Sequence, residues 1–363
     1  MIATRHEASS RHRLTNRPVG FRAESVASGY KRWMHVQEFF GPRILIVSGK
    51  GGVGKTTVAA ALALMAARAG RKVCVAEVDR KGTLANLFGG GELDYEPKEL
   101  SPGVWGMNIV PENALAEYLE VQYHMRRISK AFTSSHFVDY ITTAAPGLKD
   151  ILILGKIWYL EQGRSRGPRH DFDTIIVDAP AAGHMLTFLS APLGLSDAVR
   201  VGPIRRQADW LVQMLRNPKR ARVHLVTLAE EMPVSETLET AEALSTRFKI
   251  PTGAVIANAV YSPLFTREEE RFVRSIENEE LPEDVTKPAK EIGLELDDED
   301  KRALVGYARF LLSRRAIQAG HLRALTKEIP DPVVTLPFLF SSGLELPDIE
   351  TLADVLEREV EKL

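Results

Sequence analysis

A glycine-rich loop between an apolar strand and a helix constrains this chain more than any other feature. Residues 48–57 read SGKGGVGKTT, after the apolar run at 43–47 and before a segment at 56–68 with helical spacing. The spacing G-x-x-x-x-G-K-[ST] is that of a phosphate-binding loop, in which glycines let backbone N–H groups surround phosphate oxygens. The sequence therefore predicts a nucleotide site built from Gly49, Lys50, Gly51, Gly52, Val53, Gly54, Lys55, Thr56 and Thr57.

Three side chains of this loop have separate expected roles. Lys55 is expected to contact the β- and γ-phosphates, and the Thr56 hydroxyl to be a ligand of Mg²⁺. Thr57 is placed against the α-phosphate. An ordinary glycine-rich turn is disfavoured because the strand, the spacing, the Lys-Thr pair and the helix are all present.

Two aspartates follow apolar strands and are the expected acidic groups of the site. Asp79 follows the strand at 72–78 and Asp178 follows the strand at 174–177. Ligands of an open α/β sheet bind at the carboxyl ends of its strands, so both carboxylates can face the phosphates. We expect Asp178 to hold Mg²⁺ through water and Asp79 to orient the attacking water. The alternative for each is a helix N-cap aspartate.

Lys50 is a second lysine in the loop, although Lys55 already supplies the charge that phosphates require. The pattern K-G-G-x-G-K-T-T resembles the deviant Walker A motif of the MinD/ParA/nitrogenase-iron-protein/ArsA superfamily. In that superfamily the first lysine reaches across a dimer interface to the partner's nucleotide, much like an arginine finger. The resemblance implies an ATP-dependent homodimer with Lys50 acting in trans; a solvated surface lysine is the alternative.

Further segments resemble the ArsA/GET family, the arsenite-pump ATPase and the targeting ATPase of tail-anchored membrane proteins. Residues 146–150 and 230–237 resemble two of its characteristic stretches, Asn258 its adenine-contacting asparagine and Pro337 the start of its adenine loop. Asp178, Gly183 and His184 fall in the segment that resembles switch II. The resemblance implies ATP and Mg²⁺ as cofactors.

The chain also departs from the family's pattern at both switches. Family switch I usually continues D-P-A-H, whereas this chain has Asp79-Arg80-Lys81-Gly82, and Ala182 replaces a switch II threonine. Hydrolysis is expected to persist, with altered coupling of switch movement to a client.

The sequence has one cysteine, Cys74, and this excludes the relatives whose metal sites need several cysteines. Cys74 lies within an apolar strand and is interpreted as a small buried hydrophobe. Thiolate sites for zinc, a soft metalloid or an iron–sulfur cluster need several cysteines. A lone cysteine also gives no disulfide framework, which fits a cytoplasmic location.

The composition of the chain argues against some classes of binding partner. The chain has 363 residues and a formal net charge of −1, which disfavours broad attraction to nucleic acid or anionic lipid. No apolar run reaches the roughly 20 residues of a membrane-spanning helix. A basic stretch at 200–222 is interpreted as a solvated helix face in preference to a DNA-binding strip.

Alternating strands and helices predict the α/β class, a doubly wound, mostly parallel sheet with a P-loop NTPase core. Strands are expected to end at Val47, Val78, Val110, Val177, Thr227, Asn258 and Leu336. Insertions at 111–167 and 262–325 have helical patterns, and the resemblance implies that they join in one helical subdomain. Apolar positions in the first insertion are assigned to its own core in preference to a client groove.

The first 42 residues are expected to be a flexible extension, because residues 1–31 are rich in Arg, Ser and His and lack an apolar period. Translation starting at Met34 is a further hypothesis. The P-loop ATPase domain is expected to occupy 43–363.

The resulting functional hypothesis is a cytoplasmic Mg²⁺-dependent ATPase, a nucleotide-gated dimer that drives transport or chaperoning of an unidentified client. A ParA/MinD-like positioning switch is one alternative, although the acidic C-terminal segment at 352–363 lacks the basic amphipathic pattern of a membrane anchor. An ATP-binding regulatory subunit of a hetero-dimer is the other.

Overall fold

The computed structural model describes residues 36–78, 82–123, 147–163, 171–276, 281 and 283–363. Within these residues the chain forms an eight-stranded sheet with the order β3-β4-β2-β5-β1-β6-β7-β8. All neighbouring strands are parallel except β3 and β4. The strands are β1 (Ile44–Gly49), β2 (Val73–Glu77), β3 (Lys98–Ser101), β4 (Val104–Asn108), β5 (Thr174–Ala181), β6 (Ala221–Leu228), β7 (Thr252–Val260) and β8 (Val333–Pro337).

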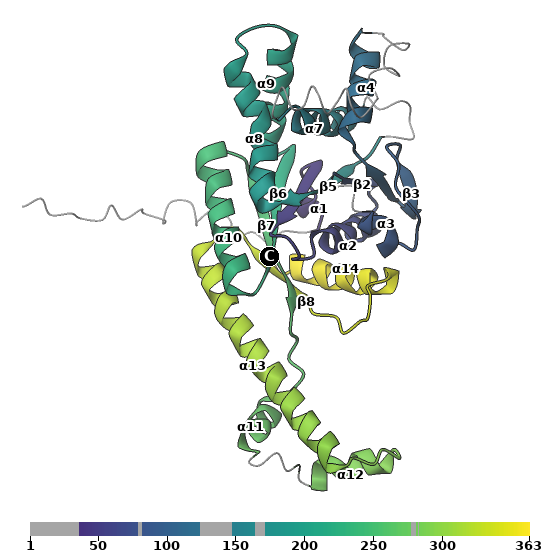
Figure 1. Ribbon diagram of the computed structural model, residues 1–363, viewed down its shortest axis with the longest axis vertical. Helices are drawn as coiled ribbons and strands as arrows, with labels where there is room; N and C mark the ends of the chain where they lie inside the picture. The colour runs from purple at the N-terminus through teal and green to yellow at the C-terminus, as the bar shows by residue number, and fades with distance from the viewer. Residues whose placement is uncertain (1–35, 79–81, 124–146, 164–170, 277–280, 282) are drawn as a thin grey trace, which may run out of the picture. The chain divides into compact units, whose positions relative to one another are not determined.

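The central strands are apolar runs because both of their faces are covered. Every residue of β1 and of β2 is buried. A parallel sheet normally has helices on both faces, so its strands lose the polar–apolar alternation of a half-exposed strand. The sheet is therefore the centre of the core, with helices on both sides (Figure 1).

Helices α2 (Lys55–Arg68), α3 (Thr83–Leu87) and α14 (Leu346–Val360) cover one face of the sheet. Val47, Val75 and Ile176 pack there against α2, whose many alanines allow close approach to the strands. Leu352 and Leu356 of α14 belong to the same cluster. This face carries the beginning of α2 and hence the end of the phosphate loop.

The opposite face is covered by α7 (Leu148–Glu161), α8 (Ala182–Ala198), α9 (Pro203–Arg216) and α10 (Glu231–Glu242), which continues into a π-helical turn at Ala243–Phe248. Cys74, Ile175 and Val177 point to this side and pack with Met185 and Leu189 of α8. Successive residues of a strand face opposite sides of a sheet, which divides the buried residues into these two clusters.

These observations confirm the α/β fold class and the mostly parallel sheet. Each of the seven expected strands is present, and each ends within four residues of the predicted position. β3 was not predicted, because Lys98-Glu99-Leu100-Ser101 has only one apolar residue and forms the antiparallel edge of the sheet. Cys74 is buried in β2, as the sequence indicated.

Both insertions contain helices. The first contributes α4 (Pro111–Tyr123) and α7, which pack on each other, and α7 also contacts α8 and α9. The second contributes α11 (Arg267–Ser275), α12 (Glu283–Glu291) and the long α13 (Asp298–Glu328). α13 packs on α10, α11 and β7.

The packed part of the chain begins before residue 43. Helix α1 (Val36–Phe39) precedes β1, and the side chains of Phe39 and Phe40 are buried in the core. Residues 36–42, which the sequence analysis assigned to the flexible extension, therefore belong to the folded unit. Met34 lies outside the described residues. No helix among the described residues is long and apolar enough to cross a membrane.

Candidate nucleotide site

The phosphate loop lies between β1 and α2, and two of its glycines are required by close contacts. A Cβ atom on Gly49 would lie 2.0 Å from the carbonyl oxygen of Val226 in β6. Gly54 has φ +88°, and a Cβ there would lie 2.3 Å from Nδ2 of Asn258. Larger residues at these two positions would push the loop away from the neighbouring strands, so the loop needs its glycines for packing as well as for phosphate access.

Lys55 is the first residue of α2, and its side chain is directed back over the loop. The residue is 8% exposed, and Nζ donates a hydrogen bond to the carbonyl oxygen of Lys50 at 3.2 Å. The helix N-terminus adds the positive end of its dipole at the same place. This arrangement fits an anionic ligand bound within the loop.

Thr56 and Asp178 lie together beside the loop. Thr56 Oγ1 donates a hydrogen bond to Asp178 Oδ2 at 2.6 Å, joining the first turn of α2 to β5. A hydroxyl oxygen next to a buried carboxylate is the type of donor set that Mg²⁺ prefers. The residues present therefore fit a magnesium ion that would also contact the phosphates. Thr57 follows in the same turn and is partly buried.

Asn258 connects β7 to the loop. Its Nδ2 donates to the carbonyl oxygen of Val53 at 2.9 Å. Pro337 is the last residue of β8 and lies opposite Val260 of β7. The structure thus brings both expected adenine-contacting residues to the ends of adjacent strands, and Asn258 lies against the loop itself.

Three aromatic residues beside these strand ends were not predicted as part of the site. Tyr261 stacks on Phe338 with ring centroids 5.1 Å apart, and Phe340 packs edge-on against Phe338 at 5.0 Å. Phe340 is among the exposed apolar residues. The signal in the sequence was an aromatic residue within three positions of each strand end, which is too common to be recognised alone.

The turn after Asn258 is held by a glutamine from α13. Ala259 has φ +55°, a left-handed conformation that is uncommon for alanine. Gln318 Nε2 donates to the carbonyl oxygen of Ala259 at 3.0 Å, and the N–H of Tyr261 donates to Gln318 Oε1 at 2.8 Å. Gln318 is 5% exposed. Sequence reasoning missed Gln318 because it is 59 residues away in the chain.

Lys50 forms an ion pair within its own chain. Its Nζ lies 2.9 Å from Oε1 of Glu236 in α10, with the two side chains 32% and 40% exposed. Glu236 belongs to the 230–237 stretch that the sequence analysis noted without assigning it a role. A lysine this exposed remains accessible to a second molecule.

The expected switch II residues lie at the junction of β5 and α8. Gly183 and His184 are exposed in the first turn of α8. His184 is near Asp150 in the first turn of α7: burial raises the pKa of Asp150, and the charge of His184 partly offsets this. Asp79 lies outside the described residues.

Two polar side chains in the strands beyond Asp178 were also not predicted: Glu77 in the neighbouring β2 and Asn108 in β4, one strand further. Glu77 and Asn108 end β2 and β4. Both oxygens of the Glu77 carboxylate and Oδ1 of Asn108 are buried with no hydrogen-bond partner in the described part of the chain.

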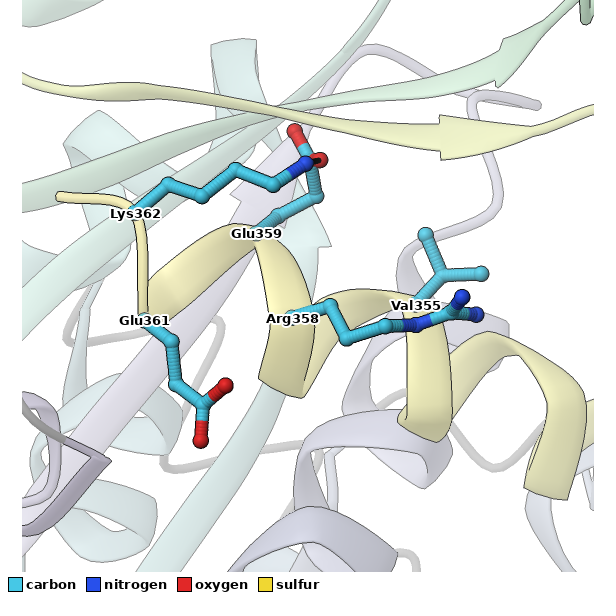
Figure 2. A pocket seen from close by; sticks show the side chains of 5 residues that line it. All are labelled: Val355, Arg358, Glu359, Glu361 and Lys362. Carbon is cyan, nitrogen blue, oxygen red and sulfur yellow. Dashed lines mark hydrogen bonds and ion pairs between the residues drawn. The ribbon is translucent and has the colours of Figure 1, made fainter.

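A shallow hollow on α14 does not belong to this site. It is lined by Val355, Arg358, Glu359, Glu361 and Lys362 (Figure 2). Glu359 pairs with Lys362 and accepts a hydrogen bond from Thr335 at 3.3 Å. The charges of Glu359 and Lys362 therefore compensate each other within the chain.

The parallel sheet, the glycine-rich loop and the Thr56–Asp178 pair together define a P-loop nucleotide-binding protein. A sequence profile of the anion-transporting ATPase family, ArsA, matches residues 42–215. ATPase BagA of Mycobacterium tuberculosis is 33% identical over 328 residues, which cover 88% of this chain and 94% of BagA. The chain belongs to the anion-transporting ATPase family, which confirms the resemblance noted above, and it is an ATPase.

More distant relatives are longer than this chain. ATPase ARSA1 of Chlamydomonas reinhardtii is 24% identical over 291 residues, which cover 71% of this chain but 35% of ARSA1. An uncharacterized protein of Streptomyces coelicolor is 30% identical over 168 residues, 46% of this chain and 41% of that protein.

Proposed function

We propose that this ATPase requires Mg²⁺ and works as a nucleotide-gated dimer that couples ATP turnover to transport or chaperoning of a client. The observation that carries the proposal is the hydrogen bond between Thr56 and Asp178 beside the phosphate loop. It joins a hydroxyl and a carboxylate beside the loop, and these two groups would hold the metal ion.

Each part of ATP has a binding group in this arrangement. The loop N–H groups and Lys55 would bind the phosphates, and Thr56 and Asp178 would hold a metal ion, whose chemistry would be to neutralise charge on the phosphoryl group. Asn258, Pro337 and the aromatic residues beside them contact the adenine, because stacking on an aromatic face suits a planar base. Asp79 orients the attacking water.

Lys50 supplies the link to a partner subunit. Its side chain is paired only with Glu236 among the contacts described and is one-third exposed, so modest rearrangement releases it to a second nucleotide site. A lysine arriving in trans adds positive charge at the transferred phosphoryl group, which makes hydrolysis dependent on dimer formation.

Two features bear on the client. Cys74, the single cysteine, is buried, so thiolates of this chain do not hold a soft metalloid. In the basic stretch, Arg205 pairs with Asp209, Arg220 pairs with Glu161, and Arg216 donates to the carbonyl oxygen of Phe248. These internal partners favour a structural role over nucleic-acid binding. Movement of α8 on nucleotide exchange would reach α7, α9 and α10, which it contacts.

The proposal is tested by light-scattering mass and ATP turnover of the full chain, with and without Mg²⁺ and a non-hydrolysable ATP analogue. Wild type should form a dimer with the Mg²⁺ complex of the analogue. Asp178→Asn should retain binding in EDTA and lose about 100-fold in turnover, since a metal-supporting carboxylate contributes ~3 kcal/mol to the transition state. Asp79→Asn should bind nucleotide and not hydrolyse it.

The matched variant for dimer formation is Lys50→Ala. It should bind the analogue with nearly wild-type affinity and remain monomeric. Equal loss of binding and dimer formation would contradict the role in trans. A wild-type monomer without turnover would reject the homodimer and favour a hetero-dimer with a related subunit.

A further inference from the structure

Glu77 has an environment that a structural carboxylate rarely has. It is the last residue of β2, is 1% exposed, and both of its oxygens are buried without a hydrogen-bond partner in the described ranges. Burying carboxylate oxygens without donors costs several kcal/mol, roughly, in a protein interior. We therefore expect a bound group that supplies hydrogen-bond donors or positive charge to lie next to the carboxylate of Glu77.

The sheet places Glu77 directly beside the proposed metal site. Its Cα is the register partner of Asp178 in β5 on one side and of Asn108 in β4 on the other. Neighbouring strands lie about 4.8 Å apart. Glu77 is thus one strand away from the carboxylate that accepts the hydrogen bond from Thr56.

The three polar residues also share one face of the sheet. Val73 and Val75 of β2 pack in the cluster that includes α2, and Glu77 follows at the next position with the same orientation. The same alternation leads from Ile176 to Asp178 in β5 and from Val104 to Asn108 in β4. The row Glu77, Asn108 and Asp178 is therefore on the side of the sheet that carries Thr56.

A hydrated divalent cation matches the unpartnered acceptors. Mg²⁺ binds oxygen at about 2.1 Å and usually keeps several waters in proteins. A further hydrogen bond of about 2.7 Å from such a water extends the reach of the site to roughly 4–5 Å from the ion. This is close to the spacing between adjacent strands, so water on a metal held by Thr56 and Asp178 would be within reach of the carboxylate of Glu77 on the next strand.

We propose that Glu77 is a second carboxylate of the Mg²⁺ site. The oxygens of Glu77 accept hydrogen bonds from water bound to the metal, and the side-chain amide of Asn108 supports the same position from the neighbouring strand. The inference rests on the proposed Mg²⁺-dependent nucleotide binding. Glu77 is then a residue that does not bind the metal directly but forms hydrogen bonds with the water molecules bound to it. Such residues influence the affinity of a site for a hard, hydrated cation.

The test is a Mg²⁺ titration of the binding of a fluorescent non-hydrolysable ATP analogue to the full chain. Glu77→Gln should raise the half-saturating Mg²⁺ concentration about tenfold or more, because loss of an outer partner weakens a metal site by 10–100-fold, roughly. Affinity measured in EDTA should stay within about twofold of wild type. Glu77→Asp, which keeps the charge on a shorter side chain, should be intermediate.

A thermal measurement separates this role from a structural one. Without metal or nucleotide, Glu77→Gln should melt at or above the wild-type temperature, because it removes an uncompensated buried carboxylate. When Mg²⁺ and the ATP analogue are added together, the melting temperature of Glu77→Gln should rise less than that of wild type. Asp171→Asn, which changes an exposed carboxylate paired with Arg43, is the control and should match wild type in both measurements.

Mn²⁺ binding followed by electron paramagnetic resonance gives an independent value for metal affinity. A shift in the Mg²⁺ midpoint below about twofold for Glu77→Gln, or equal losses in EDTA and Mg²⁺, would overturn the assignment. Asn108→Ala should raise the half-saturating Mg²⁺ concentration at least threefold, roughly. If Glu77→Gln does not fold, Asn108→Ala tests the assignment in its place. Wild type without Mg²⁺-dependent binding would instead reject the proposed function.

Discussion

The ammonium group of Lys50 lies 2.9 Å from the carboxylate of Glu236 within one chain. The proposed role of Lys50 in trans requires this ion pair to break when two subunits meet. Glu236 then competes with the partner's nucleotide for the same lysine. The strength of the pair sets how much this competition matters, and partly exposed pairs contribute about 0–1 kcal/mol.

Glu236→Gln should therefore strengthen nucleotide-dependent dimer formation modestly. Release of Lys50 lowers the dimer dissociation constant by at most about fivefold, which corresponds to ~1 kcal/mol. Analytical ultracentrifugation in the presence of Mg²⁺ and the non-hydrolysable ATP analogue measures this dissociation constant. Glu239→Gln, one turn further along α10, is the control and should have no effect. A weaker dimer with Glu236→Gln would show that Glu236 contributes to the interface itself.

The phosphate loop offers a matched pair of glycine substitutions. Gly54 has φ +88°, and a Cβ there would lie 2.3 Å from Asn258 Nδ2, whereas a Cβ on Gly51 would meet nothing within 4 Å. Gly54→Ala should lower the free energy of unfolding by about 1–3 kcal/mol through backbone strain and the displaced hydrogen bond to Val53. Gly51→Ala should change it by less than about 0.5 kcal/mol.

Chemical denaturation of the nucleotide-free protein measures both variants. Asn258→Ala combined with Gly54→Ala removes the clash, so part of the lost stability should return. Equal stability of Gly51→Ala and Gly54→Ala would show that the loop is free to move away from Asn258.

The sequence predicted the parts of the molecule in which local pattern and tertiary environment agree. Strands buried on both faces have long apolar runs, and the loop motif specifies its own strand and helix, so the sheet and the phosphate loop were identified. β3 was missed because an edge strand needs few apolar residues. Gln318 was missed because no local pattern connects a glutamine in α13 to the turn after Asn258.

Glu77 shows a different limit of sequence reasoning. The run Val73-Cys74-Val75-Ala76-Glu77 indicated a strand, and a terminal glutamate is normally solvated there. Only the register with β4 and β5 shows that this carboxylate is buried beside Asp178 and Asn108. The pairing order of strands, which crosses the chain order, supplied the information that the sequence lacked.

His224 makes the stability of the fold depend on pH. It lies in β6 against the ring of Phe39, and burial lowers the pKa of His224 from 6.5 to about 4, while a hydrogen bond with the carbonyl oxygen of Ala254 partly opposes this. The unfolded chain binds a proton at higher pH than the native chain. Stability from this group is therefore complete above pH 6.5 and is lost as pH falls toward 4.

The expected loss is up to about 3 kcal/mol between these two pH values, because one pKa unit corresponds to about 1.4 kcal/mol. Urea denaturation at several pH values measures it, and the informative quantity is the difference between wild type and His224→Leu. That variant should have a shallower pH dependence than wild type has. Identical slopes for wild type and His224→Leu would exclude His224 as the cause.

The turn after Asn258 yields two variants with opposite expected effects. Gln318→Leu removes both hydrogen bonds that hold the backbone of Ala259 and Tyr261, and leaving these groups unpaired should cost about 2 kcal/mol of the free energy of unfolding. Ala259→Gly should instead gain about 0.5–1 kcal/mol, because relief of the left-handed conformation exceeds the added entropy of glycine in the unfolded chain.

Nucleotide affinity shows whether this turn also positions Asn258. Gln318→Leu should weaken binding of the ATP analogue severalfold, since Asn258 directly precedes the turn and its amide holds the carbonyl of Val53 in the loop. Calorimetric titration at a temperature where both variants are fully folded separates this effect from stability. Gln213→Leu, at an exposed position of α9, is the control. If Gln318→Leu loses stability but binds the analogue as wild type does, α13 supports the fold without positioning the nucleotide, and movement of α13 would then have no route to the phosphate loop through Asn258.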